Sequence, residues 1–398
     1  MVVPRRRSVH RSCTDCYSRG VARGSVRRKD NAWSYRVDLG PDPVTGRRHQ
    51  IAKQGFRTRK EAEAALGEVL SANAAGRVVQ RSSATTGEFL EDWLTTQEIR
   101  LRPTTVHSYR MAIARISRRI GKVPLQALTP IQIEALYSDL IKGGGRAGRS
   151  LSAKTVRNAH VVLRKALSDA ERLGVVQRNV AAAARPPTFS RPEFATWSSD
   201  DLREFLAAIR DERVYSAVVV LATTGMRRGE VLGLRWPNVD LDAGQLAIVQ
   251  TLTAVNGQPV IGPTKTTRSR RTVYLDSHTV DALRAHRTRQ REERLIAGPA
   301  WDNFTDLAFR DEIGKPLHPD WFSREFTRVV AVSGAPPIRL HDLRHTFATL
   351  ALKAGVHPKI VSERLGHATV GITLDLYSHV TPAIARDAAD VVARSIFQ

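Results

Sequence analysis

The sequence predicts a mainly α-helical protein with small β elements, an α+β chain with three domains. Three patterns indicate this: alternating apolar residues near the N-terminus, apolar stripes at helical spacing through the middle, and a long C-terminal stretch of helices interrupted by one β insertion. A length of 398 residues suits two or three domains at about 150 residues each.

Composition shifts and turn residues place the domain boundaries. We expect a basic leader over 1–24, a β-rich domain over 25–75, a linker over 76–85, a helical domain over 86–180, a second linker over 181–194 and a C-terminal domain over 195–398.

The N-terminal domain is predicted to contain three short strands and one helix. Trp33, Tyr35 and Val37 alternate with polar residues, as on a strand with one buried face. Thr58 is a typical N-cap, and the helix that it starts is expected over 59–72. A small sheet of this kind can enter the major groove of DNA.

The middle domain is predicted to be a bundle of four amphipathic helices. Tyr109, Ile113 and Ile116 have the spacing of one helix face, and Thr129 and Ser152 are typical helix starts. Few acids accompany the basic residues of its polar faces, which favours a phosphate-facing surface over an ordinary solvated one. The arginines concerned are Arg110, Arg115, Arg118 and Arg119.

The formal charge of +23 and a pI near 10.9 indicate a nucleic-acid partner. Residues 1–80 and 81–187 carry net charges of +10 each, whereas 188–398 carry only +3. A codon bias toward arginine would raise the charge everywhere, but it would not remove acids from one half of the chain. A hydrophobic content of 42% excludes a disordered polyelectrolyte.

The sequence predicts a cytoplasmic protein that is not associated with a membrane. No apolar run approaches the roughly 18 residues of a membrane span, and the longest one, 217–222, is interpreted as buried core. The arginine-rich N-terminus has no apolar region after it, unlike a secretory signal. Two cysteines exclude a disulfide framework. Cys13 and Cys16, with His10, are too few for a structural zinc site, so an irregular leader is favoured.

Three short stretches of the C-terminal domain are candidates for catalytic chemistry. They are 223–230 (TTGMRRGE), 341–348 (HDLRHTFA) and 365–367 (LGH). Lys265 lies between the first two, and Tyr377 follows the third by ten residues. Each stretch alone is a weak signal, because a histidine and an arginine three residues apart are more often a surface pair.

Together these residues resemble the tyrosine recombinase family, the integrases of phages and integrative elements, over about residues 85–398. The family's order of Arg, Lys, His-x-x-Arg, His and Tyr recurs as Arg227, Lys265, His341, Arg344, His367 and Tyr377. The resemblance implies a site-specific DNA recombinase that cuts and rejoins DNA to integrate or excise a phage or mobile element. Bond energy is conserved in a covalent link to the enzyme, so no ATP, cofactor or metal is expected.

The resemblance assigns the bond-making roles to two residues. Tyr377 would be the nucleophile that attacks the scissile phosphate and forms a 3′-phosphotyrosyl link. Lys265, in the loop of the predicted β insertion, would be the general acid for the departing 5′ oxygen.

The remaining residues would contact and orient the phosphate. The guanidinium forks of Arg227 and Arg344 match phosphate oxygens bidentately, and His367 would donate a further hydrogen bond. His341 would help manage the tyrosine proton and position the phosphate. Glu230 is a candidate support that orients Arg227 or His341.

The resemblance also implies partners. The 25–75 unit resembles an arm-type DNA-binding domain, and 86–180 a helical core-binding, SAM-like domain. Double-stranded DNA with core and arm sites is therefore expected, bound by a homo-tetramer, and an excision factor or DNA-bending host factor is left open. An apolar stripe near the C-terminus is expected to dock on a neighbouring protomer rather than within its own domain: Ile384, Ala388, Val391 and Ile396.

Three alternative functions fit these residues less well. A chromosome-dimer resolvase of the same family is disfavoured by the N-terminal domain, which such resolvases usually lack. A catalytically inert DNA-binding regulator is disfavoured because Tyr377 and both arginines are present. A type IB topoisomerase shares the nucleophile but acts as a monomer.

Overall fold

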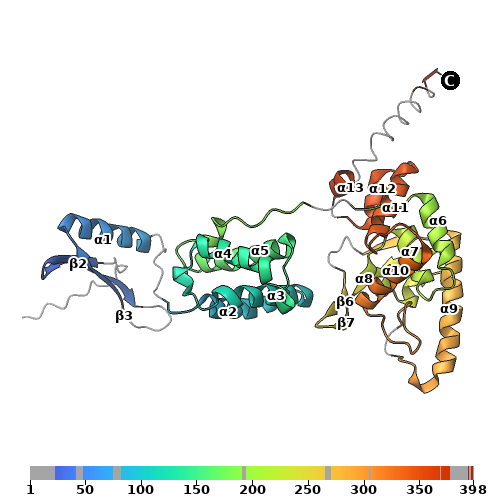
Figure 1. Ribbon diagram of the computed structural model, residues 1–398, viewed down its shortest axis with the longest axis horizontal. Helices are drawn as coiled ribbons and strands as arrows, with labels where there is room; N and C mark the ends of the chain where they lie inside the picture. Colours follow the sequence, from blue (N-terminus) through green and yellow to red (C-terminus); the bar gives the residue numbers. More distant parts are fainter. Residues whose placement is uncertain are drawn as a thin grey trace, which may run out of the picture. The chain divides into compact units, whose positions relative to one another are not determined.

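The computed structural model describes residues 23–41, 48–74, 82–190, 194–264, 270–303, 306–367 and 369–376, together with 393, 396 and 397. These residues fall into two units, one within 1–101 and 108–189 and the other within 102–107 and 190–398. Figure 1 shows the elements of each, coloured along the chain.

An antiparallel sheet and one helix form the N-terminal part. Strands β1 (Arg23–Lys29), β2 (Ala32–Pro41) and β3 (Arg48–Phe56) pair in the order β1-β2-β3. Helix α1 (Arg59–Ala74) packs Leu66 against the buried Tyr35 and Val37 of β2. The predicted elements are confirmed, and each strand is longer than expected. Arg23 and Gly24, assigned to the leader, belong to β1.

Four helices follow, as the apolar stripes predicted. Their starts are fixed locally: Thr85 and Thr129 each form a capping box with the residue three positions on, and the Ser152 hydroxyl accepts from the Thr155 amide. The helices are α2 (Thr86–Glu98), α3 (Pro103–Ile120), α4 (Pro130–Gly143) and α5 (Ala153–Arg172).

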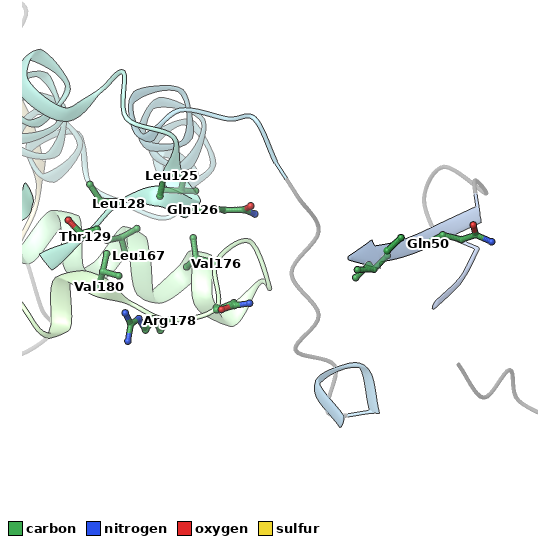
Figure 2. A pocket seen from close by; sticks show the side chains of 13 residues that line it. Gln50, Leu125, Gln126, Leu128, Thr129, Leu167, Val176, Arg178 and Val180 are labelled. Atoms are coloured by element: carbon green, nitrogen blue, oxygen red, sulfur yellow. The ribbon is translucent and has the colours of Figure 1, made fainter. Parts of the chain in front are cut away.

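The interior of this bundle is apolar. Leu90, Ile113 and Leu163 are fully buried. Figure 2 shows Leu167 and Val176 beside one side of a pocket that residues of the bundle line. Short 3₁₀ turns connect the helices, at Leu125–Ala127, Arg146–Gly148 and Val180–Ala182.

The segment predicted as the second linker begins within the bundle. Ala181 and Ala184 are buried, and the Asn179 amide donates to the Arg164 carbonyl at 2.8 Å. The first residues after 180 therefore pack with the helices before them.

The C-terminal unit combines helices with two small sheets. One sheet has the order β4-β5-β8, from β4 (Val239–Asp240), β5 (Gln245–Ile248) and β8 (Arg271–Tyr274). The other is the hairpin β6 (Gln250–Val255) and β7 (Gln258–Pro263). The single predicted insertion is thus two sheets, although its turn at Asn256 and Gly257 is where expected, with φ of 51° and 77°.

Eight helices are described in this unit. Helix α7 is buried on nearly every side, which explains the apolar run at 217–222, and it packs against α9 and α11. The helices are α6 (Ser199–Ala208), α7 (Tyr215–Thr224), α8 (Arg228–Leu232), α9 (Ser277–Ala297), α10 (Pro319–Ser333), α11 (Asp342–Lys353), α12 (Pro358–Leu365) and α13 (Val370–Leu376), with short 3₁₀ turns at Trp236–Asn238 and Gly298–Ala300.

Some expectations concern residues outside the described ranges. His10, Cys13 and Cys16 are among them, as are Ile384, Ala388 and Val391, whereas Ile396 is described and exposed. Within the described part of the chain, no helix is long and apolar enough to cross a membrane. In that same part, no three His, Cys, Asp or Glu side chains are grouped to hold a metal ion.

Candidate active site

The two predicted phosphate-binding arginines are held by the carbonyl end of helix α12. Arg344 Nη2 donates to the Leu365 carbonyl at 2.6 Å, and Arg227 Nη2 donates to the next carbonyl, of Gly366, at 3.2 Å. Because these carbonyls are consecutive, both guanidinium groups lie in one small region. The carbonyl end of a helix is its negative pole, which favours cations there.

Two glycines make this arrangement possible. Gly225 ends α7 and Gly366 ends α12, both in the left-handed conformation with φ of 65°. A Cβ at Gly225 would lie 2.5 Å from Phe347, and one at Gly366 would lie 2.9 Å from an Arg271 nitrogen. Gly225 also offers its carbonyl to Arg344 Nη1 at 2.7 Å. The glycines of two sequence motifs are therefore required by the backbone.

The two arginines differ in exposure. Arg344, in the first turn of α11, is only 4% exposed. The Arg227 side chain is 39% exposed and stands directly before α8. Arg344 is therefore a fixed charge within the protein, while Arg227 borders solvent.

Glu230 holds Arg227 in place. Its Oε1 accepts from Arg227 Nη1 at 2.8 Å, and its Oε2 accepts from the Arg227 amide at 2.9 Å. Burial of the carboxyl group opposes ionisation, but the hydrogen bonds and charges of Arg271 and Arg227 outweigh it and lower the pKa of Glu230. Of the two partners predicted for Glu230, the structure shows contact with Arg227.

Arg271 is a member of this network that the sequence did not reveal. It is the first residue of β8, and its side chain is 8% exposed. Its Nη2 donates to Glu230 Oε2 at 3.0 Å, and its Nε donates to the Arg364 carbonyl at 2.6 Å. The only sequence signal is its position six residues after Lys265, where a strand begins.

His341 lies directly before α11, next to a second histidine. The His341 and His345 rings meet edge to face at 5.3 Å, and His345 stacks on Phe194 at 4.2 Å. His341 is partly accessible to solvent, but desolvation of its ring, followed by the charge of Arg344, lowers the pKa of His341. Burial of the His345 ring, and then its electrostatic interaction with His341, lower the pKa of His345 to about 4. Both rings are therefore neutral at pH 7.

A buried carboxylate fixes the start of α11. Asp342 accepts from Arg339 Nε at 2.9 Å and from Arg339 Nη2 at 2.8 Å. Burial would raise the pKa of Asp342, but the Arg339 hydrogen bonds outweigh burial and lower it. This ion pair orients the turn that carries His341 and Arg344.

His367 follows Gly366 and lies near both arginines. Its amide donates to the Ser362 carbonyl at 3.0 Å, and its Nδ1 lies 2.8 Å from Thr373 Oγ1. Burial, then the charges of Arg344 and Arg227, lower the pKa of His367 to about 4. The ring is neutral at pH 7 in the DNA-free protein.

Lys265 and Tyr377 lie outside the described residues. The nearest described neighbours of Lys265 are the buried Thr264 and, beyond the intervening segment, Arg270. Helix α13 ends at Leu376, directly before Tyr377 in the sequence. The structure thus brings together five of the predicted site residues, and we call this group the phosphate region after its predicted role: Arg227, Glu230, His341, Arg344 and His367.

Three family models match the chain. The phage integrase family matches residues 196–383, an arm DNA-binding domain matches 25–72, and the N-terminal SAM-like domain of phage integrases matches 85–141.

Relatives of known sequence match nearly the whole chain. The tyrosine recombinase XerC-like protein of Caldanaerobacter subterraneus is 27% identical over 357 residues, covering 84% of this chain and 90% of the relative. The ICEBs1 integrase of Bacillus subtilis is 27% identical over 371 residues, covering 92% and 98%.

Solved structures share the fold. The Tn1549 transposon integrase in complex with a circular intermediate DNA has a TM-score of 0.64 at 19% identity, covering 78% of this chain and all of that one. A lambda integrase dimer bound to a COC′ core site has a TM-score of 0.54 at 20% identity, covering 91% and 96%. The mainly helical fold predicted from the sequence is confirmed. The chain belongs to the tyrosine recombinase family, the phage-type integrases, and is a site-specific DNA recombinase.

Proposed function

We propose that this chain integrates and excises a phage or mobile element by cutting and rejoining DNA at core attachment sites. The observation that carries the proposal is the pair Arg227 and Arg344, whose guanidinium groups are held by consecutive carbonyls beside His367. The similarity to the ICEBs1 and Tn1549 integrases supports a mobile-element substrate.

Fixed cations suit phosphoryl transfer because negative charge on the phosphate oxygens must be stabilised in the transition state. Arg344 is bound to protein carbonyls before DNA arrives, so little reorganisation is needed when the phosphate enters. Arg227 is partly exposed and is oriented by Glu230. Neutral His367 supplies one N–H donor to the same phosphate.

In the proposed covalent step, each bond and each proton transfer belongs to a named residue. The Tyr377 oxygen attacks phosphorus, a tyrosyl–phosphate bond forms, and the bond to the 5′ oxygen breaks. Lys265 gives its proton to that departing oxygen. His341 takes the tyrosine proton, for which its lowered pKa leaves a free lone pair at pH 7. The reverse attack by a 5′-hydroxyl rejoins the DNA.

The DNA partner would be held at two classes of site. The 25–75 region would bind arm sites, while the helical bundle and the C-terminal domain would bind the core site. A tetramer on DNA is supported by a lambda integrase tetramer bound to a Holliday junction, with a TM-score of 0.52 at 20% identity. We propose that the reaction takes place in the bacterial cytoplasm, at the nucleoid. Whether an excision factor or a DNA-bending factor is also needed is a question for the assay described next.

A suicide-substrate assay tests the proposal. Purified protein meets a nicked core-site duplex, taken from the DNA that flanks its own gene, in EDTA and without ATP. We expect a covalent protein–DNA adduct on a denaturing gel for the wild type and none for Tyr377→Phe. An adduct that persists in Tyr377→Phe would move the nucleophile elsewhere. Specific DNA binding without an adduct in either protein, even with host extract added, would support the inert regulator instead.

A further inference from the structure

A buried hydroxyl contacts the histidine of the phosphate region. Thr373 lies in α13 with no exposed surface, and its Oγ1 is 2.8 Å from His367 Nδ1. A buried hydroxyl that lost this partner would be left without a hydrogen bond, so the contact is expected to persist.

The contact bears on which ring nitrogen carries the proton. A neutral imidazole has one N–H and one lone pair. If the Thr373 hydroxyl donates to Nδ1, the proton lies on Nε2, which can then donate to a phosphate oxygen. The opposite tautomer would present a lone pair at Nε2 to an anion and would be repelled by it.

The Thr373 hydroxyl can also keep its hydrogen bond when the charge of the His367 ring changes. A bound phosphate would stabilise the protonated imidazole, and Nδ1 would then become a donor. The threonine hydroxyl can rotate and accept that hydrogen bond, so the contact survives both states. Valine has the same shape and can do neither.

The same contact joins the histidine to another element. Helix α13 packs on α12, which ends at Gly366, and α13 ends one residue before Tyr377. Thr373 precedes Tyr377 by four residues. A hydrogen bond from α13 to His367 therefore ties the segment leading to the nucleophile to the arginine pair.

We propose that Thr373 is a positioning residue of the recombination reaction: it holds His367 with the proton on Nε2 and docks α13 beside the phosphate region. The inference rests on the proposed function, because the donated hydrogen bond matters only if a phosphate enters there.

The chain offers a matched control for a threonine-to-valine change. Thr349, in α11, is also buried, and its hydroxyl makes no hydrogen bond among the described residues. Thr349→Val therefore removes a buried hydroxyl without removing a hydrogen bond. Thr373→Ser keeps the hydroxyl at the site and removes only a methyl group.

The first measurement needs no DNA. Nitrogen NMR of full-length protein with ¹⁵N-labelled histidine reports the tautomer of each ring, and His367→Gln assigns the signal. We expect a single Nε2–H tautomer for the wild type and for Thr373→Ser, and a mixture for Thr373→Val. An Nδ1–H tautomer in the wild type, or an unchanged signal in Thr373→Val, would overturn the inference.

The second measurement is the rate of adduct formation on the nicked core-site duplex. We expect Thr373→Val to be about tenfold slower at saturating DNA, as for the loss of one hydrogen bond in the transition state, with DNA affinity unchanged. Thr373→Ser and Thr349→Val should remain within about twofold of the wild type. A Thr373→Val rate equal to that of Thr349→Val would contradict the positioning role.

The two measurements can disprove the proposed function and the positioning role independently. If the wild type forms no adduct, the proposed function fails, while the tautomer experiment still decides whether Thr373 sets the His367 ring. If the wild type forms the adduct and the tautomer does not depend on Thr373, only the positioning role is wrong.

Discussion

The arginines of two regions of this protein differ in burial and in hydrogen bonding. In the C-terminal unit, Arg344 is buried and bonded to two backbone carbonyls. On α3, Arg118 and Arg119 are exposed, and within the described residues neither side chain makes a hydrogen bond or an ion pair. A buried, bonded guanidinium has a fixed position and can match a transition state, whereas a solvated one supplies charge without geometry.

Not every arginine of the predicted phosphate-facing surface belongs to the second kind. Arg110 pairs with Glu98 at the surface, so part of its charge is already compensated. The comparison therefore predicts effects on chemistry in one region, and small, salt-dependent effects on binding in the other.

The largest effect is expected at Arg344. Arg344→Lys keeps the charge but cannot reach the Gly225 and Leu365 carbonyls and also present two donors to phosphate. We expect the rate of adduct formation at saturating DNA to fall by about 10² to 10³-fold, as for the loss of an oriented donor. DNA affinity, measured by fluorescence anisotropy, should change little. A rate within tenfold of the wild type would mean that charge alone suffices, and the comparison would fail.

A smaller effect is expected at Glu230, which orients the more exposed arginine. Glu230→Gln leaves Arg271 and Arg227 facing a neutral amide, and breaking a buried ion pair from one side is destabilising. We expect the free energy of unfolding to fall by about 2 to 4 kcal/mol, measured by urea unfolding at pH 7, together with a slower adduct. An unfolding free energy equal to that of the wild type would show that Arg271 forms other hydrogen bonds or ion pairs in the variant.

The pH dependence of that loss sharpens the test. The pKa of Glu230 is lowered from 4.5 in the folded state, so its contribution to stability is present above about pH 4.5 and is lost as the pH falls through the folded value. The stability difference between wild type and Glu230→Gln should therefore shrink below pH 4.5. Asp342→Asn gives a comparison, because the pKa of Asp342 is lowered by a different partner, Arg339.

The half-buried His345 predicts a further loss of stability in acid. The pKa of His345 falls from 6.5 to about 4 on folding, so the unfolded chain binds more protons between these values. Stability is therefore full above pH 6.5 and decreases toward pH 4. His345→Phe, which keeps the stacking on Phe194, should flatten this decrease in DNA-free protein, measured by thermal unfolding from pH 4 to 7. An unchanged slope would show that His345 does not titrate on unfolding in this range.

Local signals account for what the sequence predicted well. Thr58, Thr129 and Ser152 start helices through contacts within three residues, and the glycines of the motifs are required by positive φ angles. The motif arginines and histidines were recognisable because phosphate chemistry restricts the residue types that it can use.

The missed residues depend on contacts between distant segments. Arg271 reaches Glu230 across 41 residues, and this contact exists only once β8 lies beside α8 and α12. Thr373 is only six residues from His367, yet the contact depends on the packing of α13 against α12. Neither position carries a pattern that periodicity or spacing would single out.

The smallest effect is expected for the exposed arginines of α3. If Arg118 and Arg119 each neutralise one phosphate, Arg118→Ala with Arg119→Ala should weaken DNA binding and reduce the slope of log K against log salt by about 2. The loss should be equal for core-site and unrelated duplexes, because phosphate contacts carry no sequence information. The rate of adduct formation at saturating DNA should stay within about twofold of the wild type. A large loss of rate would show that these arginines also fix the position of the DNA, and the division between buried, oriented charge and exposed, solvated charge would no longer hold.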